Sequence, residues 1–150
     1  MPKRSAGLLL HRSGAHGPEV LLVHLGGPLW AKKDAGAWTM PKGEYDPGED
    51  PLAAAEREFA EELGQAAPPG PRRDLGEVRQ SGGKLTRLWA VEGDLDVAVV
   101  HSNTFDMEWP PRSGRRQEFP EIDRAAWFPL DQARQALLTS LVPFLDRLVT

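Results

Sequence analysis

The segment 43–65 constrains the fold and the chemistry of this chain more than any other part of its sequence. It begins with a loop rich in Gly and Pro. Asp50-Pro51 then predicts the start of a helix, because Asp caps helix N-termini and Pro fits the first helical position. Gly64 is a typical residue for the end of that helix. The apolar residues in between recur at the spacing of one helix face, and they are Leu52, Ala55, Phe59 and Leu63.

Three carboxylates lie on one side of this predicted helix. Glu58 and Glu62 are four residues apart and face the same way, and Glu61 lies beside them. Like charges repel at this spacing, and a hard divalent cation removes that cost, since Mg²⁺ prefers oxygen ligands and keeps water molecules for substrate phosphates. We expect the backbone carbonyl of Gly43 to approach the same ion. A solvated acidic face is the alternative, but it leaves the glycine loop at a fixed offset unexplained.

The segment reads Gly43, five residues, Glu49, seven residues, then Arg57-Glu58-Phe59-x-Glu61-Glu62-x-Gly64. This pattern resembles the Nudix box, a specific motif that covers about a sixth of the chain. One position departs from the motif, because Gln65 stands where an aliphatic residue is usual, and we expect Ala66 or a local shift to compensate. We also expect Glu49 to pair with Arg57 and brace the loop against the helix.

The resemblance implies an α+β fold, an α/β/α sandwich around a mixed β-sheet, with one domain over 1–150. It implies dependence on Mg²⁺, for which Mn²⁺ substitutes, and hydrolysis of a nucleoside diphosphate linked to another moiety. The implied metal ligands are Gly43, Glu58, Glu61 and Glu62, and the implied catalytic residues are these three glutamates with Arg57 and Glu49.

The residue that takes the proton from water stays open at this stage, as does the number of metal ions. Pyrophosphate cleavage needs an activated water and neutralised phosphates. Glu58 is one candidate for the general base, and a later loop offers Glu118 and Glu121. Surface charge is the alternative explanation for these last two residues.

Basic residues are the candidates for binding the phosphates that the metal leaves uncovered. Lys42 directly precedes the glycine of the box. Arg112, Arg115 and Arg116 fall in the segment 110–118, which we predict to be a flexible loop that closes over a long anionic chain. Solvated surface charge is the alternative for each arginine taken singly. Among the aromatic residues, Trp30 and Trp109 border loops and are candidates for stacking on a base.

The segments Pro41-Lys42-Gly43 and Pro47-Gly48-Glu49 resemble the branch of Nudix enzymes that hydrolyses dinucleoside polyphosphates and diphosphoinositol polyphosphates. A dinucleoside polyphosphate is therefore the expected substrate. A nucleoside triphosphate pyrophosphohydrolase of the housecleaning type is the alternative. A Nudix module that binds nucleotides without cleaving them is a weaker alternative, because it would normally have lost glutamates that this chain retains.

Composition limits the remaining possibilities. The chain has 150 residues, a net charge of −4 and no Cys, which excludes disulfides, thiolate zinc sites and cysteine nucleophiles. The charge gives no general attraction to nucleic acid or to anionic membranes. We expect a cytoplasmic monomer or homodimer whose partner is a small nucleotide or polyphosphate, with no nucleic acid or membrane partner.

Hydrophobic patterning predicts the other elements. The central helix follows the third of these predicted strands. Strands are expected at 6–11, 20–25, 38–40, 74–80, 84–92, 95–100, 104–109 and 125–128, and further helices at 130–138 and 141–148.

Overall fold

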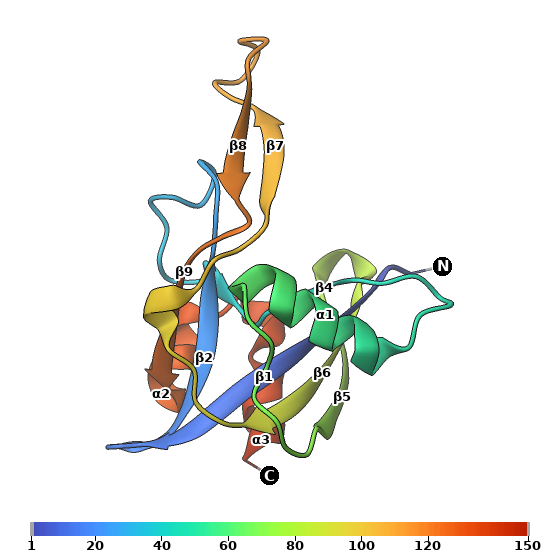
Figure 1. Cartoon of the computed structure of the whole chain (residues 1–150), viewed down its shortest axis with the longest axis vertical. Coiled ribbons are helices and arrows are strands. Elements are labelled where there is room, and N and C mark those ends of the chain that lie inside the picture. The colour runs from blue at the N-terminus through green and yellow to red at the C-terminus, as the bar shows by residue number, and fades with distance from the viewer. Residues whose placement is uncertain (1, 150) are drawn as a thin grey trace.

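The computed structural model describes residues 2–149, and its elements follow the order seen in Figure 1. Three of the helices are short 3₁₀ turns, labelled η. The strands are β1 (Arg4–Gly14), β2 (Gly17–Leu25), β3 (Trp38–Thr39), β4 (Lys42–Glu44), β5 (Arg73–Arg79), β6 (Leu85–Glu92), β7 (Thr104–Glu108), β8 (Arg116–Pro120) and β9 (Ile122–Pro129). The helices are α1 (Pro51–Leu63), η1 (Ser81–Gly83), η2 (Val97–Val99), α2 (Leu130–Ala136), η3 (Thr139–Leu141) and α3 (Pro143–Leu148).

A seven-stranded mixed sheet forms the body of the molecule. Its main path runs β3-β2-β1-β6-β5, while β4 pairs with β1 and β9 pairs with β2. The β1–β6 pair is parallel, and the other pairs of this sheet are antiparallel. The hairpins predicted between the first two strands and between 74–80 and 84–92 are therefore confirmed.

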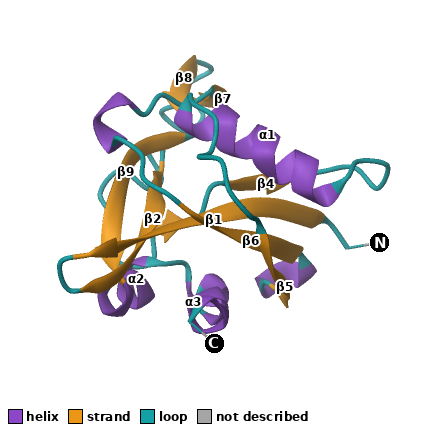
Figure 2. Cartoon of the chain, turned by 60° about the horizontal axis from the view of Figure 1, so that its bottom comes forward, coloured by secondary structure: helices purple, strands orange, loops and turns teal. Residues whose placement is uncertain are grey.

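Helices cover both faces of the sheet (Figure 2), with α1 on one face and α2 and α3 on the other. The side chains of β1 alternate between the two resulting cores. Leu8 and Leu10 join Phe59 of α1, whereas Leu9 joins Phe144 of α3. All five side chains are fully buried. The predicted α/β/α sandwich around a mixed sheet is confirmed.

Three local predictions are wrong. The segment 95–100 is irregular and contains η2 instead of a strand, because Asp96 caps that turn through the backbone N–H of Ala98 while Val97 and Val100 pack on the core. The segment 110–118 is not simply a loop, since β8 begins within it. β4 was expected as part of a loop, and it forms because its residues pair with β1.

The strands β7 and β8 form a separate two-stranded sheet that projects from the body (Figure 1). Their register begins where Thr104 faces Pro120 and continues to the pair formed by Glu108 and Arg116. The hairpin therefore leaves the body and returns to it at one place. No helix within residues 2–149 has the length and apolar character needed to cross a membrane.

Candidate active site

Helix α1 supplies the acidic part of the candidate site. Its start is capped as predicted, with the Asp50 side chain accepting the N–H of Ala53 at 2.9 Å. At its end Gly64 adopts the left-handed conformation, and its N–H reaches the carbonyl of Ala60 at 2.8 Å. Phe59 and Leu63 are buried against the sheet. The capped and packed helix fixes the backbone that carries the three glutamates.

Glu62 is the most deeply buried carboxylate of α1, with 5% of its surface exposed. The backbone N–H of Lys42 lies near this carboxylate and slightly offsets the rise of its pKa, but the Oε2 atom of Glu62 is buried without a hydrogen-bond partner. Burial raises the pKa of Glu62 to about 9, and the negative charges of Glu58 and Glu121 add to this effect. An unpartnered buried carboxylate oxygen is costly, so this position calls for a proton or a cation.

Gly43 lies against the carboxylate of Glu58. A Cβ atom built on Gly43 would be 2.1 Å from the Glu58 carboxyl carbon and 2.2 Å from its Oε2. Any larger residue would therefore push Glu58 away from β4. Burial, together with the charge of Glu61, raises the pKa of Glu58. The glycine of the motif is thus explained by the close approach of a carboxylate to the backbone.

Arg57 connects the glycine loop with the carboxylates. Its guanidinium contacts Glu49 at 3.1 Å, Glu58 at 3.1 Å and Glu61 at 3.7 Å. Glu49 also accepts the backbone N–H of Asp46 at 3.2 Å. The expected Glu49–Arg57 pair is present, and it ties the loop to the first half of α1.

Backbone hydrogen bonds place Glu121 at the C-terminal end of α1. The carbonyl of Glu61 accepts the N–H of Asn103 at 3.1 Å, and the carbonyl of Asn103 accepts the N–H of Glu121 at 2.9 Å. Burial and the charge of Glu61 raise the pKa of Glu121. Glu118, three residues earlier, lies on β8 and accepts a hydrogen bond from the Thr104 hydroxyl. The structure therefore brings Glu121 to the acidic cluster and leaves Glu118 on the projecting hairpin.

A cavity of about 360 Å³ opens beside Glu62 and Glu121. Lys42 lines it, and burial, with a smaller contribution from Lys84, lowers the pKa of this lysine. An adjoining apolar cleft of about 170 Å³ shares Trp30 and Phe105 with it. The cavity beside Glu62 is lined by Leu25, Gly26, Trp30, Thr39, Lys42, Glu62, Phe105, Glu121, Ile122 and Leu138.

The apolar cleft lies between the loop after β2 and the start of β7. Gly27 is at φ +92°, and a Cβ atom on it would be 2.8 Å from the Phe105 ring. Met107 and Trp30 complete the apolar lining. Trp30 was expected at a base-stacking position, whereas Phe105 was not identified. The alternating pattern of 104–109 was a signal that this side chain shares a face with Met107, but nothing in the sequence placed that face beside α1.

Comparison with known proteins assigns the family. The model for the NUDIX domain matches residues 1–149. The chain belongs to the Nudix family. An RNA pyrophosphohydrolase from Rhizobium meliloti is 33% identical over 124 residues, covering 73% of this chain and 66% of that protein. The asymmetrical bis(5'-nucleosyl)-tetraphosphatase of Rattus norvegicus is 41% identical over 68 residues, covering 41% of this chain and 46% of that protein.

Solved structures agree with the Nudix fold. The binary complex of the C. elegans Ap4A hydrolase has a TM-score of 0.64 at 23% identity, covering 98% of this chain and 95% of that chain. This likeness concerns the fold alone. The chain spans about two thirds or less of the length of the curated Nudix relatives named above.

The donors of the Nudix segment fit a divalent cation. Among residues 2–149, no three carboxylate or imidazole groups stand close enough together to ligate one ion as they lie. Arg57 engages Glu58 and Glu61, whereas Oε2 of Glu62 is buried and unpartnered. Carboxylate and carbonyl oxygens are the ligands that Mg²⁺ prefers. The buried oxygen and the donor chemistry thus both suit Mg²⁺, and reorientation of the Glu58 and Glu61 side chains away from Arg57 would complete the set.

Ala66 does not compensate for Gln65, the departure from the Nudix pattern, whereas the packing of Ala67 fits the expected local shift. Ala66 is exposed, whereas Ala67 packs against the core on the α1 side of the sheet. Gln65 is partly buried, and its side-chain nitrogen has no hydrogen-bond partner. The helix ends at Gly64, so the chain turns before Ala66 reaches the core.

The three arginines predicted to bind substrate lie at the far end of the hairpin, away from α1 (Figure 1). Glu108 shapes this tip by accepting the N–H groups of Arg112 at 3.0 Å and Gly114 at 3.2 Å. Arg116 approaches Asp106 at 4.0 Å. The structure does not bring these arginines together with the carboxylates, and their contact with substrate stays a prediction.

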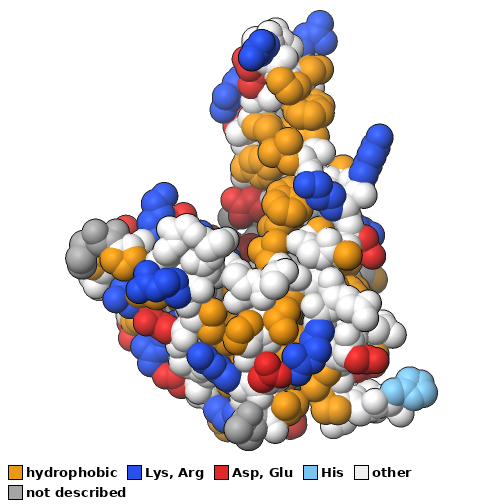
Figure 3. Space-filling view, turned by 180° about the vertical axis from the view of Figure 1, so that it is seen from behind, with side chains coloured by type: hydrophobic (Ala, Val, Ile, Leu, Met, Phe, Trp, Pro, Cys, Tyr) orange, Lys and Arg blue, Asp and Glu red, His pale blue; other side chains and the backbone are white. Residues whose placement is uncertain are grey.

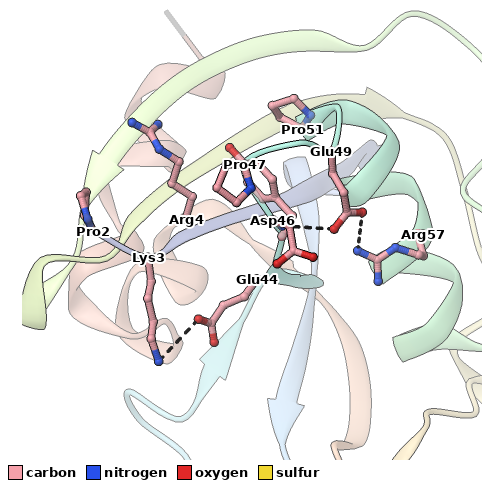
Figure 4. Close-up of a pocket in the computed structure, with 10 residues that line it drawn as sticks. Pro2, Lys3, Arg4, Glu44, Asp46, Pro47, Glu49, Pro51 and Arg57 are labelled. Atoms are coloured by element: carbon pink, nitrogen blue, oxygen red, sulfur yellow. Dashed lines mark hydrogen bonds and ion pairs between the residues drawn. The ribbon is translucent and has the colours of Figure 1, made fainter.

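A larger cavity, of about 760 Å³, is lined by residues 2–4, by the Nudix loop and by Arg57 (Figure 4). Arg57 and Glu49 reach it from the Nudix segment, and Lys3 and Glu44 face each other across it at 3.8 Å. The lining carries as many acidic as basic side chains, so this cavity offers no surplus positive charge for a polyphosphate. The smaller cavity beside Glu62 is the candidate active site.

Proposed function

We propose that this Nudix chain hydrolyses a phosphoanhydride bond of a nucleoside polyphosphate with the help of Mg²⁺, or of Mn²⁺ in its place. The proposed ligands are Glu58, Glu61, Glu62 and the carbonyl of Gly43. One observation carries the proposal: Oε2 of Glu62 is buried without a partner, close to two other carboxylates and beside a cavity. The names of the curated relatives, which are pyrophosphohydrolases and a tetraphosphatase, support it.

The residues around the cavity have different roles in the proposed reaction. Bound Mg²⁺ supplies charge neutralisation on the phosphates and a more acidic water. Lys42 faces the same cavity and binds a phosphate oxygen. Arg57 and Glu49 hold the loop and Glu58 in place through their ion pairs. Each is a positioning residue in this proposal, because its contacts are with protein groups.

Two carboxylates are the candidates for the general base. Glu121 lines the cavity, and burial raises its pKa, so it accepts a proton more readily than an exposed glutamate. Glu58 shares this property and lies against Gly43. Glu118 is held by Thr104 on the hairpin. We therefore favour Glu121 or Glu58 over Glu118.

The proposed substrate is a dinucleoside polyphosphate, with a nucleoside triphosphate as the alternative. The Trp30–Phe105 cleft would hold a base, and the adjoining cavity would hold the phosphates. The tetraphosphatase relative supports the first substrate. A binding module without activity is disfavoured, because all the acidic residues of the motif are present. A cytoplasmic location and a monomeric or homodimeric state stay predictions.

The test is a substrate panel with product identification. Purified protein is incubated with diadenosine tetraphosphate and with each nucleoside triphosphate, with Mg²⁺, with Mn²⁺ and with excess chelator. Chromatography identifies the nucleotides released. We expect cleavage that stops in chelator. Cleavage at full rate in chelator, or no cleavage of any member with either metal, would overturn the proposal.

A further inference from the structure

The hairpin β7–β8 has two chemically different faces. On β7, Phe105 and Met107 point to one side, and Asp106 and Glu108 point to the other, because successive side chains of a strand alternate. Phe119 of β8 lies opposite Phe105, with ring centroids 6.1 Å apart. Figure 3 shows hydrophobic side chains along the projecting hairpin. The hairpin thus presents an apolar face and an acidic face.

The apolar face continues from the candidate active site. Phe105 lines both the cavity beside Glu62 and the adjoining cleft, and Met107 lines the cleft. Trp109 follows at the same alternation, and its N–H donates to the carbonyl of Arg115 at 2.9 Å, so pairing continues beyond β7. Side chains on one face of a strand are about 7 Å apart. A regularly spaced apolar track therefore runs from the nucleoside cleft toward the hairpin tip.

Positive charge stands at the outer end of this track. Figure 3 shows Lys or Arg side chains at the tip of the hairpin. Within residues 2–149, neither Arg112 nor Arg115 has a side chain in an ion pair, while Arg116 has a distant one with Asp106. Aromatic platforms next to free arginines are the combination that binds single-stranded nucleic acid, through base stacking and phosphate contacts.

We propose that the apolar face of the β7–β8 hairpin binds the single-stranded RNA that continues from the 3′ side of a 5′-polyphosphorylated nucleoside in the cleft. This inference rests on the proposed hydrolysis of a nucleoside polyphosphate, and it takes the alternative substrate, a nucleoside triphosphate at the 5′ end of an RNA, in place of the dinucleoside polyphosphate. Bases of the following nucleotides stack along Met107 and Trp109, and Arg112 and Arg115 contact the backbone phosphates. The net charge of the whole chain does not oppose this, because the contact is local to the tip.

The position of the hairpin selects this ligand over a dinucleoside polyphosphate. In a dinucleoside polyphosphate the second nucleoside is attached through the phosphates, so it extends past the carboxylates. In RNA the second nucleotide is attached at the 3′ oxygen of the first nucleoside, on the side away from the phosphates. Phe105 and Met107 of the hairpin line the nucleoside cleft, whereas Glu62 and Glu121 line the adjoining cavity, so an extension from the nucleoside itself is the one that runs along the hairpin. The RNA pyrophosphohydrolase relative is consistent with this ligand.

The test compares a 5′-triphosphorylated octaribonucleotide with the matching nucleoside triphosphate and with diadenosine tetraphosphate. For the wild type we expect kcat/KM to be highest on the octaribonucleotide. In the double variant Trp109→Ala/Arg115→Ala, kcat/KM on the octaribonucleotide should fall roughly tenfold or more, because stacking and phosphate contacts are lost. The ratio of the octaribonucleotide to the mononucleotide is the decisive quantity. Asp106→Asn, on the acidic face, is the matched control and should leave that ratio unchanged.

Binding is measured separately, so that failure of the hydrolase proposal and failure of the hairpin proposal are distinguishable. Fluorescence polarisation of a 3′-labelled octaribonucleotide, without divalent cation, should show weaker binding to the double variant than to Asp106→Asn. An unchanged ratio together with unchanged binding overturns the inference. Equal losses on the octaribonucleotide and the mononucleotide also overturn it. A wild-type dimer that Trp109→Ala converts to a monomer would identify the face as a subunit interface and overturn it as well.

Discussion

The C-terminal half of α1 and the hairpin β7–β8 differ in how strongly contacts with the rest of the molecule constrain them. The glutamates of α1 stand on a capped helix whose apolar side is buried in the core, and one of them presses on the backbone of Gly43. The hairpin makes its own small sheet and projects from the body (Figure 1). A two-stranded hairpin is only marginally stable by itself. In the proposed function, bond cleavage takes place at the more constrained region, and the less constrained region recognises the rest of the substrate.

The largest expected effect is on kcat, from a substitution in the constrained region of α1. Glu62→Gln should lower kcat at least about a hundredfold, comparable to the loss of one essential charge-stabilising group. The amide keeps the size of the side chain but cannot carry the negative charge that a divalent cation needs. Steady-state kinetics with Mg²⁺ measures this, with circular dichroism to confirm the fold.

The matched control is Glu44→Gln. Glu44 is exposed on β4 and pairs only loosely with Lys3 at 3.8 Å. The variant Glu44→Gln should keep kcat within about twofold of the wild-type value, as expected for a surface substitution away from the reacting groups. Equal rates for Glu62→Gln and the wild type would remove Glu62 from the site.

A single methyl group tests how tightly the acidic region is packed. Gly43→Ala places a Cβ atom 2.1 Å from the Glu58 carboxyl carbon, so Glu58 must move. We expect a loss of about 1–3 kcal/mol in the free energy of unfolding, as for other overpacked positions, and a clear fall in kcat. Gly48→Ala is the control, since a Cβ atom there has no neighbour within 4 Å. Similar behaviour of the two variants in urea denaturation and kinetics would show that Gly43 is not a close contact.

The raised pKa of Glu62 predicts a pH dependence of stability without divalent cation. The pKa of Glu62 is about 9 in the folded chain against 4.5 for an ordinary glutamate, so folding is favoured by the bound proton. This contribution is complete below pH 4.5 and is lost as pH rises toward 9. The free energy of unfolding of the wild type should therefore fall relative to that of Glu62→Gln over this range. Added Mg²⁺ should stabilise the wild type more at high pH, because it binds the ionised carboxylate.

Urea denaturation of the wild type and of Glu62→Gln at pH 5, 7 and 9 measures how the difference in their free energy of unfolding changes. A constant difference between the wild type and Glu62→Gln across these pH values would contradict the burial-based pKa of Glu62.

The smallest effect is expected at the hairpin tip. Arg115→Ala should change the free energy of unfolding by less than about 0.5 kcal/mol, because its side chain is exposed. Arg72→Ala should cost about 1–3 kcal/mol, because Arg72 contacts Glu56 through two nitrogens and the carbonyls of Pro68 and Gly70 at 2.8 Å each. Urea denaturation of both variants gives the two values. Comparable losses would mean that the tip contributes to the stability of the body.

Local sequence was enough to predict the acidic region. Asp50, Pro51 and Gly64 mark the ends of α1, and the 3.6-residue spacing shows which side is buried. The Glu49–Arg57 pair also follows from the motif. The sandwich followed from the resemblance and from the strand pattern, with the hairpin of β1 and β2 signalled by turn residues.

The rest of the site depends on contacts between distant segments. Glu121 and Glu118 are equivalent in the sequence, and they differ because the N–H of Glu121 bonds to Asn103, which in turn bonds to α1. The pairing of 104–108 with 116–120 was hidden by the Gly-Ser-Pro-Arg composition between them. Residue type alone does not tell whether such a segment is mobile or paired. Phe105 became a candidate only once β7 was placed beside the loop after β2.

The hydrogen bond between Asn103 and Glu121 has a consequence for how this chain can change over evolutionary time. It closes the base of the hairpin, so the seventeen-residue excursion from 104 to 120 begins and ends at two points that are held together. Residues can be added to or removed from the outer part of that excursion without changing where Glu121 sits relative to α1. Insertions of this kind cost little in closure entropy. The outer hairpin is thus an exchangeable module, through which one hydrolytic centre can be adapted to substrates of different length.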